Sequence, residues 1–146
     1  TGGSSSSSSG EHRIATLGPG SEEDIGKKAL KLTNEFRRAQ GVKPDLTWNS
    51  QMATVGREHS ANMSNGKVPF GHAGFSGRAT RIGGHSQGEN VAMNYGFGDP
   101  ATTAVRGWID SPGHRKNLLG HWNNCGIGVY TGYDGKCYLT QLFNCP

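Results

Sequence analysis

The run SPGHRKNLLGHWNNCGIGVY, from Ser111 to Tyr130, places an imidazole and a guanidinium, His114 and Arg115, at the start of a predicted short helix. Upstream, a Gly-Glu-Asn triplet sets the carboxylate of Glu89 beside a glycine. Imidazoles and carboxylates bind zinc and transfer protons in many enzymes. Here they lack the spacing of a zinc-binding His-Glu-x-x-His helix, and no G-x-S-x-G motif supplies a serine nucleophile. Spacing alone therefore gives only a weak indication of metal or hydrolytic chemistry.

Helical periodicity and capping residues predict the elements that position these groups. Helices are predicted at 22–40, from a cap at Asn49 or Ser50 to about 65, after Asp99-Pro100, and from Ser111-Pro112 to Gly120. The second helix should bury His59 on its inner face as a hydrogen-bonded histidine. The stretch 67–87 is rich in Gly, Ser, Arg and His and is predicted to be a long loop, with Glu89 also in a loop. A central hairpin is predicted from 126–130 and 137–143.

Length and composition indicate one domain with a compact core. The chain has 146 residues, of which 32% are hydrophobic and 24 are glycine, so a few large side chains must anchor the core. Residues 1–20 contain a six-serine run and little that is apolar, which predicts a flexible tail or linker before a single domain at 21–146. The expected anchors are Phe36, Trp48, Trp108 and Phe143.

The excess positive charge does not indicate a nucleic-acid partner. The net charge is +4, and five basic residues gather on the first predicted helix, which is expected to be a solvated face. No nucleic-acid-binding motif is present, and no run approaches the ~18 apolar residues that span a bilayer. Those five basic residues are Lys27, Lys28, Lys31, Arg37 and Arg38.

Three cysteines stand within the last 22 positions, without the C-x-x-C spacing of a zinc site. Asp134-Gly135 is typical of a two-residue hairpin turn, and pairing outward from it sets Cys125 opposite Asn144. A bulge or a slightly longer loop would align Cys125 with Cys145. We therefore expect a Cys125–Cys145 disulfide and a free thiol at Cys137.

Five features of the chain resemble the CAP superfamily, named for cysteine-rich secretory proteins, antigen 5 and pathogenesis-related 1 proteins. They are LKLTNEFRRAQGVKPDLTWNSQMA, REHSANM, FGHAGFSGR, GENVA, and W-x-x-SPGHRKNLL running into CGIGVY and YLTQLF, which together span about 28–143. The short GHRKNLL form is similar to the bacterial, fungal and protist branch. The resemblance implies an α/β fold, a three-layer α-β-α sandwich with a small, mainly antiparallel sheet, and secretion.

The resemblance also implies a cleft lined by two histidines and two acidic residues. Carried over by motif, these are His72 from FGH, Glu89 from GEN and His114 from SPGHR. Two histidines and one glutamate with water form a known kind of open zinc site, so zinc or another divalent cation could bind there. No cofactor is expected to be required.

The fourth position of the cleft departs from the family pattern. The family's second acid would follow Trp108 by three positions, where this chain has Ser111, with Asp110 alongside. His85, four residues before Glu89, competes with the histidine of FGH for a local contact. Glu89 also has a structural interpretation, in which it accepts backbone N–H bonds and ties its loop to a helix start.

The resemblance favours a secreted, non-enzymatic domain that binds a lipid or sterol in extracellular interaction or defence, and an isolated domain is expected to be a monomer. One alternative is metal-dependent hydrolysis with Glu89 as general base. Another is an adhesive or structural unit of an extracellular assembly, tethered through the serine-rich tail or Cys137 to an extracellular protein partner. Asn62 begins the N-glycosylation sequon Asn-Met-Ser, which fits a secreted chain.

Overall fold

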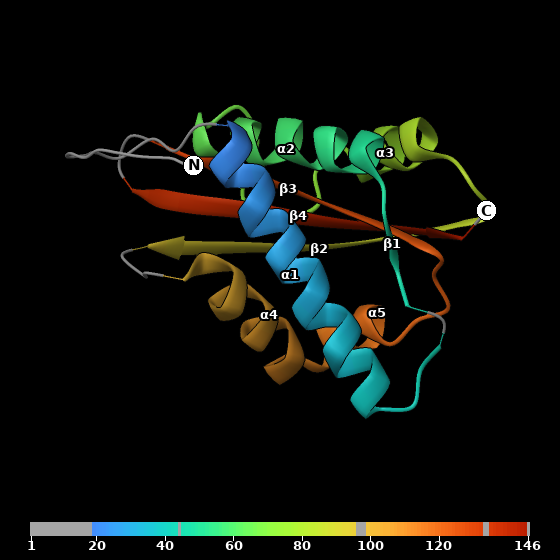
Figure 1. Ribbon diagram of the computed structural model, residues 1–146. Coiled ribbons are helices and arrows are strands. Elements are labelled where there is room, and N and C mark those ends of the chain that lie inside the picture. Colours follow the sequence, from blue (N-terminus) through green and yellow to red (C-terminus); the bar gives the residue numbers. More distant parts are fainter. Residues whose placement is uncertain (1–18, 44, 96–98, 133–134, 146) are drawn as a thin grey trace.

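A four-stranded sheet with the order β1-β3-β4-β2 separates two layers of helices (Figure 1). The computed structural model describes residues 19–43, 45–95, 99–132 and 135–145. Helices α2 and α3 cover one face of the sheet, and α1, α4 and α5 cover the other (Figure 1). The predicted α/β sandwich with a mainly antiparallel sheet is confirmed, since only β1 pairs in parallel. The elements are α1 (Pro19–Ala39), β1 (Thr47–Trp48), α2 (Ser50–Ser64), α3 (Phe75–Ile82), β2 (Ser86–Tyr95), α4 (Pro100–Asp110), α5 (Pro112–Leu118), β3 (Asn124–Thr131) and β4 (Lys136–Cys145).

Side-chain caps fix where two of the predicted helices begin. Asn49 accepts the N–H of Met52 at the start of α2, and Asp99 accepts the N–H of Thr102 at the start of α4. Ser111 precedes α5 but makes no such bond, because its hydroxyl lies 3.0 Å from Nδ1 of His114. The helices predicted from periodicity are therefore all present.

Each face of the sheet has its own apolar core. The larger core lies under α1, α4 and α5 and contains the fully buried Trp108 and Phe143. The smaller one joins Met52 and Val55 of α2 to Leu142 of β4. The expected anchors Phe36 and Trp48 are partly buried against the larger core.

Glycines let α2 lie directly on strand β3. A Cβ atom at Gly128 would stand 1.8 Å from the backbone nitrogen of Arg57, and one at Gly126 would stand 2.3 Å from that of Ala53. Any side chain at these positions would push the helix away. The contact between α2 and β3 is therefore a contact between two backbones.

Two elements were missed by the sequence analysis. The stretch predicted as a loop at 67–87 contains α3, whose only large apolar side chains, Phe75 and Ile82, pack on the smaller core. Glu89 was expected in a loop but lies within β2, where it pairs with Leu142 of β4. Both elements depend on contacts with distant residues rather than on their own apolar period.

The expected disulfide is wrong: Cys125, Cys137 and Cys145 are all free thiols. Gly132 pairs with Lys136, and Gly135 has φ 84°, so the hairpin connection has three residues rather than two. The register therefore shifts away from the expected pairing, and Cys125 stands opposite Phe143 instead of near Cys145. The two thiols occupy diagonal positions, about 7–8 Å apart in a sheet, which is too far for a disulfide. Tyr133 and Asp134 of the predicted turn lie outside the described residues.

The expected solvated face of α1 holds for its lysines but not for Arg37. Arg37 is fully buried, and its Nη1 donates to the carbonyls of Leu118 and Gly120 at 2.7 and 2.8 Å. Arg38, by contrast, is exposed and pairs with Asp45. Arg37 thus ties α1 to the end of α5.

Candidate functional site

Strand β2 presents the carboxylate of Glu89 toward α3, with only 2% of the side chain exposed. Both carboxylate oxygens are occupied. Arg78 Nε donates to Oε2 at 2.6 Å, and Arg78 Nη2 donates to Oε1 at 2.7 Å. His72 Nδ1 lies 2.7 Å from the same Oε1. Glu89 is therefore the acceptor of a two-pronged guanidinium pair, the strongest geometry for a charge-assisted hydrogen bond.

Arg78 of α3 is the centre of this group and is itself buried, with 9% of its side chain exposed. Its Nη1 donates to the carbonyl of Ala73 at 2.7 Å and to Nδ1 of His59 at 3.0 Å. We refer to His59, His72, Arg78 and Glu89 as the Arg78 cluster. The cluster joins α2, the loop before α3, α3 itself and β2.

The hydrogen bonds of His59 require the neutral ring. Nδ1 accepts from Arg78, and Nε2 lies 2.6 Å from the carbonyl of Gly71, to which it donates. Burial lowers the pKa of His59, and the charge of Arg78 lowers it further. The prediction of a hydrogen-bonded histidine on the inner face of α2 is confirmed.

Helix α5 lies against β2 beside Glu89. Asn117 Nδ2 donates to the Glu89 carbonyl at 3.1 Å and to Oδ1 of Asn90 at 2.9 Å, and the Asn90 amide donates to the His114 carbonyl at 3.3 Å. Burial lowers the pKa of His114, and a positive charge on His72 would lower it further. The structure therefore brings the backbone of the SPGHR segment beside the GEN segment.

The His114 ring does not join the Arg78 cluster by a hydrogen bond in the described part of the chain. Its Nδ1 is bonded to Ser111, one turn earlier. Asp110, at the end of α4, and His85, before β2, are both exposed and have no side-chain bond to the cluster among the described residues. Of the two histidines that compete for Glu89, His72 is the one in contact.

The residues present do not fit a divalent metal. Within the described ranges, no three His, Cys, Asp or Glu side chains are placed to hold an ion. Arg78 already donates to both oxygens of Glu89 and to Nδ1 of His59, and a second cation beside that guanidinium would be repelled.

The sequence analysis missed Arg78, the residue with the most side-chain contacts in this region. One signal was available: no Asp or Glu occurs anywhere in 67–87, so a basic residue that becomes buried there must find its counter-ion elsewhere in the chain. Arg81, in the same segment, pairs with Glu58 at the surface.

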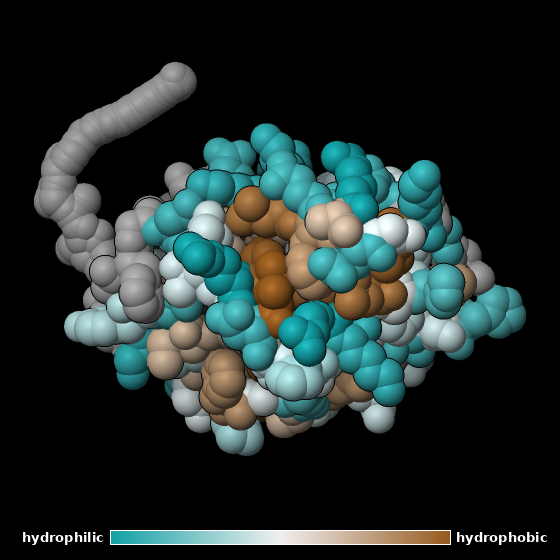
Figure 2. All heavy atoms as spheres, turned by 90° about the horizontal axis from the view of Figure 1, so that it is seen from below, coloured by the Kyte–Doolittle hydropathy of each residue, from teal (hydrophilic) through white to brown (hydrophobic). Residues whose placement is uncertain are grey.

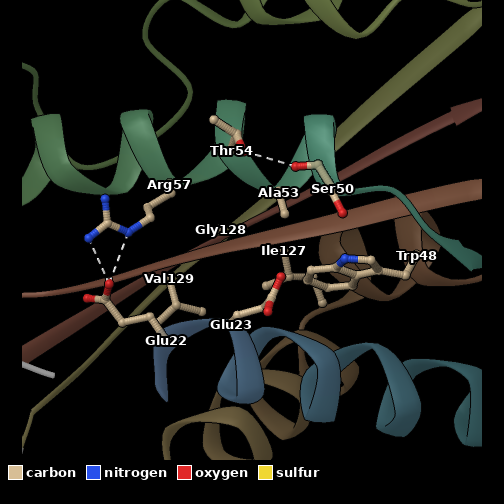
Figure 3. Close-up of a pocket in the computed structure, with 10 residues that line it drawn as sticks. All are labelled: Glu22, Glu23, Trp48, Ser50, Ala53, Thr54, Arg57, Ile127, Gly128 and Val129. Atoms are coloured by element: carbon tan, nitrogen blue, oxygen red, sulfur yellow. Dashed lines mark hydrogen bonds and ion pairs between the residues drawn. The ribbon is translucent and has the colours of Figure 1, made fainter. Parts of the chain in front are cut away.

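Two of the hollows in the described part of the chain adjoin the sheet. The first, of about 250 Å³, lies between β2 and α4, and its lining includes Val91, Gly107 and Trp108 together with the polar residues Asn94, Thr103, Ser111 and His114. The second, of about 300 Å³, lies between α1 and α2 over β3, beyond the end of the short β1 (Figure 3).

The second hollow is closed at one end by an ion pair (Figure 3). Glu22 is 1% exposed, receives two hydrogen bonds from Arg57, and accepts the N–H of Thr131 at 2.8 Å. The Glu22 carboxylate thus takes the place of a neighbouring strand at that point of the β3 edge.

Asn62 of the sequon lies in the last turn of α2 and is half-buried. Its glycosylation stays a prediction. None of the described helices is both long enough and apolar enough to cross a membrane.

Comparison with known proteins identifies relatives in bacteria. Residues 30–143 match the model of the cysteine-rich secretory protein family. The chain is 38% identical over 125 residues to the uncharacterized membrane protein YlbC of Bacillus subtilis, covering 80% of this chain and 33% of that protein. It is 30% identical over 121 residues to the uncharacterized protein YkwD of the same organism, covering 77% and 45%. The chain thus spans less than half the length of these relatives.

Solved structures share the fold. An extracellular protein with an SCP domain from Bacillus anthracis superposes with a TM-score of 0.74 at 30% identity, over 89% of this chain and 44% of that one. An outer surface protein of Borrelia burgdorferi gives a TM-score of 0.72 at 16% identity, over 89% and 96%, which shows the fold alone. The family match, the relatives and the arrangement of helices around the sheet agree, and the chain belongs to the cysteine-rich secretory protein (CAP) family.

Proposed function

We propose that this chain is a secreted, non-enzymatic SCP domain that binds the apolar part of a lipid in the hollow between β2 and α4. The observation that carries the proposal is the composition of that hollow. Its walls are mainly apolar, and Asn94, Thr103, Ser111 and His114 add polar groups to the lining. This is the distribution expected of a site that takes an acyl chain and its head group.

The Arg78 cluster supports a non-enzymatic role. A general base needs a free lone pair within reach of a substrate, whereas both oxygens of Glu89 already accept hydrogen bonds and the side chain is buried. Ser111 and His114 are hydrogen-bonded to each other, but no carboxylate orients His114 among the described residues. Ser111 and His114 therefore lack the orienting acid that completes a triad of nucleophile, base and acid.

The face that carries α4 and α5 supports an apolar ligand. Seen from that side, hydrophobic side chains gather in a central hollow and hydrophilic ones surround it (Figure 2). Leu32 and Phe36 of α1 and Ile109 of α4 are partly buried apolar side chains on this side of the sheet, and they lie outside the lining of the hollow between β2 and α4. A soluble domain gains little from such a surface unless something binds it.

Titration of the purified chain with fluorescent fatty acid and with radiolabelled cholesterol tests the proposal. Gly107 lines the hollow, and a Cβ atom there would meet nothing within 4 Å, so Gly107→Phe can fill the space without disturbing α4. We expect this variant to lower the affinity by on the order of tenfold or more. Gly77→Phe, at an equally open helical glycine outside the hollow, is the matched control. Saturable binding that is unaffected by Gly107→Phe would place the ligand elsewhere, and null titrations with both lipid classes would defeat the proposal.

One observation favours an adhesive role as a second candidate. Phe70, Met93 and Tyr95 are 56%, 41% and 61% exposed, and the Phe70 ring lies 6.4 Å from that of Tyr138. Sedimentation of the chain with and without a reductant distinguishes the two roles. A lipid carrier should remain a monomer in both, whereas concentration-dependent assembly that Tyr95→Ser abolishes would favour adhesion.

A further inference from the structure

We propose that Arg78 is a built-in cation that takes the place of a divalent metal in this chain. Two consequences follow. The natural chain should have no zinc site at His72 and Glu89, and removing the guanidinium should convert its position into one. The new site would be made of His59, His72 and Glu89.

Arg78 bonds atoms of Glu89 and His59 that could otherwise bind a metal. Its nitrogens lie 2.6 and 2.7 Å from the two oxygens of Glu89 and 3.0 Å from Nδ1 of His59. These carboxylate and imidazole atoms are the kinds of ligand that zinc selects. The guanidinium therefore stands where an ion would have to stand, with the same sign of charge.

Removal of the guanidinium would leave the carboxylate of Glu89 buried without a cation. The carboxylate of Glu89 is 2% exposed and would keep only the contact to His72. A buried carboxylate without a cation is strongly unfavourable, so the site would attract one. Zinc bonds to nitrogen and oxygen are about 2.0–2.2 Å long, whereas the Glu89 and His59 atoms now contact three different nitrogens of the guanidinium, so the ligands would have to converge on a single ion.

His59 is already oriented as a zinc ligand. Its Nδ1 points to Arg78 as an acceptor, while Nε2 donates to the carbonyl of Gly71. Metal-binding histidines commonly hold their second nitrogen in this way, which fixes both the tautomer and the ring. His72, with half of its side chain exposed, is free to turn toward the vacated position.

Zinc titration calorimetry with metal analysis tests the proposal in a Cys145→Ser background, which removes the thiol that is least buried. Arg78→Ala should gain one zinc per chain and bind it roughly 100-fold or more tightly than the parent does. Arg78→Lys keeps the cation and should gain nothing. Arg81→Ala removes an exposed arginine of the same helix and is the matched control.

Further variants assign the ligands. Adding His59→Ala or Glu89→Gln to Arg78→Ala should abolish the gained zinc. A parent chain that binds one zinc and loses it on His72→Ala would overturn the proposal. A folded Arg78→Ala chain whose zinc affinity equals that of Arg81→Ala would overturn it as well.

The variant is informative even if it does not fold alone. Zinc should then restore its circular dichroism spectrum, and the same zinc concentration should leave Arg78→Ala with Glu89→Gln unfolded. Failure of zinc to restore the first of these chains would count against the proposal. All of these readouts are independent of lipid binding, so they succeed or fail apart from the proposed function.

Discussion

Replacing Gly128 by alanine should separate α2 from the sheet and cost far more stability than adding the same methyl group at an open helical glycine such as Gly107. The added Cβ would stand 1.8 Å from the nitrogen of Arg57, 2.2 Å from the carbonyl carbon of Gly56 and 2.5 Å from the oxygen of Ala53. Side chains can turn away from such a clash, but these three atoms are backbone. The helix as a whole must therefore retreat.

The magnitude follows from the geometry. Real Cβ atoms essentially never approach within 3.0 Å of another heavy atom, so α2 has to move by about 1 Å or more. Such a movement loosens Met52 and Val55 in the smaller core and strains the bond from His59 to Arg78. Overpacking usually costs about 1–3 kcal/mol, and a clash with three backbone atoms should cost about 3 kcal/mol or more.

Urea unfolding followed by tryptophan fluorescence measures the change. Gly107→Ala is the matched control, because a methyl group added to this glycine of α4 would meet nothing within 4 Å. It should stabilise the chain by roughly 0.5–1 kcal/mol, since alanine is the better helix former. A loss below about 1 kcal/mol for Gly128→Ala would show that α2 does not lie directly on β3, and would refute the reasoning.

Three further predictions concern buried polar groups. Because folding lowers the pKa of His59 below its ordinary value of 6.5, the unfolded chain takes up the proton first as the pH falls. The free energy of unfolding should therefore be highest above about pH 7 and decline toward pH 5, and it should decline less steeply in His59→Gln. Equal slopes of unfolding free energy against pH in the two chains would contradict this prediction. Arg37→Met leaves the buried carbonyl of Leu118 and the part-buried carbonyl of Gly120 without the Arg37 donor and should cost about 2–3 kcal/mol in urea unfolding. Arg38→Met should be near neutral, and the reverse order would be inconsistent with the burial of Arg37. Thiol titration of the native chain should show one fast-reacting thiol, that of Cys145, because burial raises the pKa of Cys125. In denaturant the titration should count three thiols, and a count of only one thiol would mean that a disulfide is present.

The sequence was sufficient for the elements whose signals are local. The caps at Asn49 and Asp99 form the bonds that their residue types predict, and the apolar hairpin is the central strand pair of the sheet. The resemblance to the CAP family supplied the layer arrangement. It also identified Glu89 and His72, which are in contact.

The sequence was insufficient where the signal lies in another part of the chain. Strand β2 buries polar side chains such as Asn90 and Asn94. Asn90 donates to Gln141 of β4 and Asn94 donates to the carbonyl of Pro100, which follows β2 in the chain. The sequence of β2 therefore lacks the apolar alternation that is typical of a strand. Arg78 gave no local sign of burial, because its counter-ion is 11 positions away and on a different element. The expected disulfide is absent because the hairpin register sets Cys125 opposite Phe143, two residues from Cys145.

At the glycines of β3 the main chains of α2 and β3 touch, so the size of the main chain itself sets the distance between these two elements. Where side chains fill the gap between a helix and a sheet, each substitution there adjusts the spacing, and related sequences drift apart in shape. Here the gap holds no side chain at Gly126 or Gly128, so the apolar cores on both faces can vary without moving the helix. His59 lies on that helix and Glu89 on that sheet. Their alignment should thus persist among homologues that keep the two glycines, however far the rest of the interior has diverged.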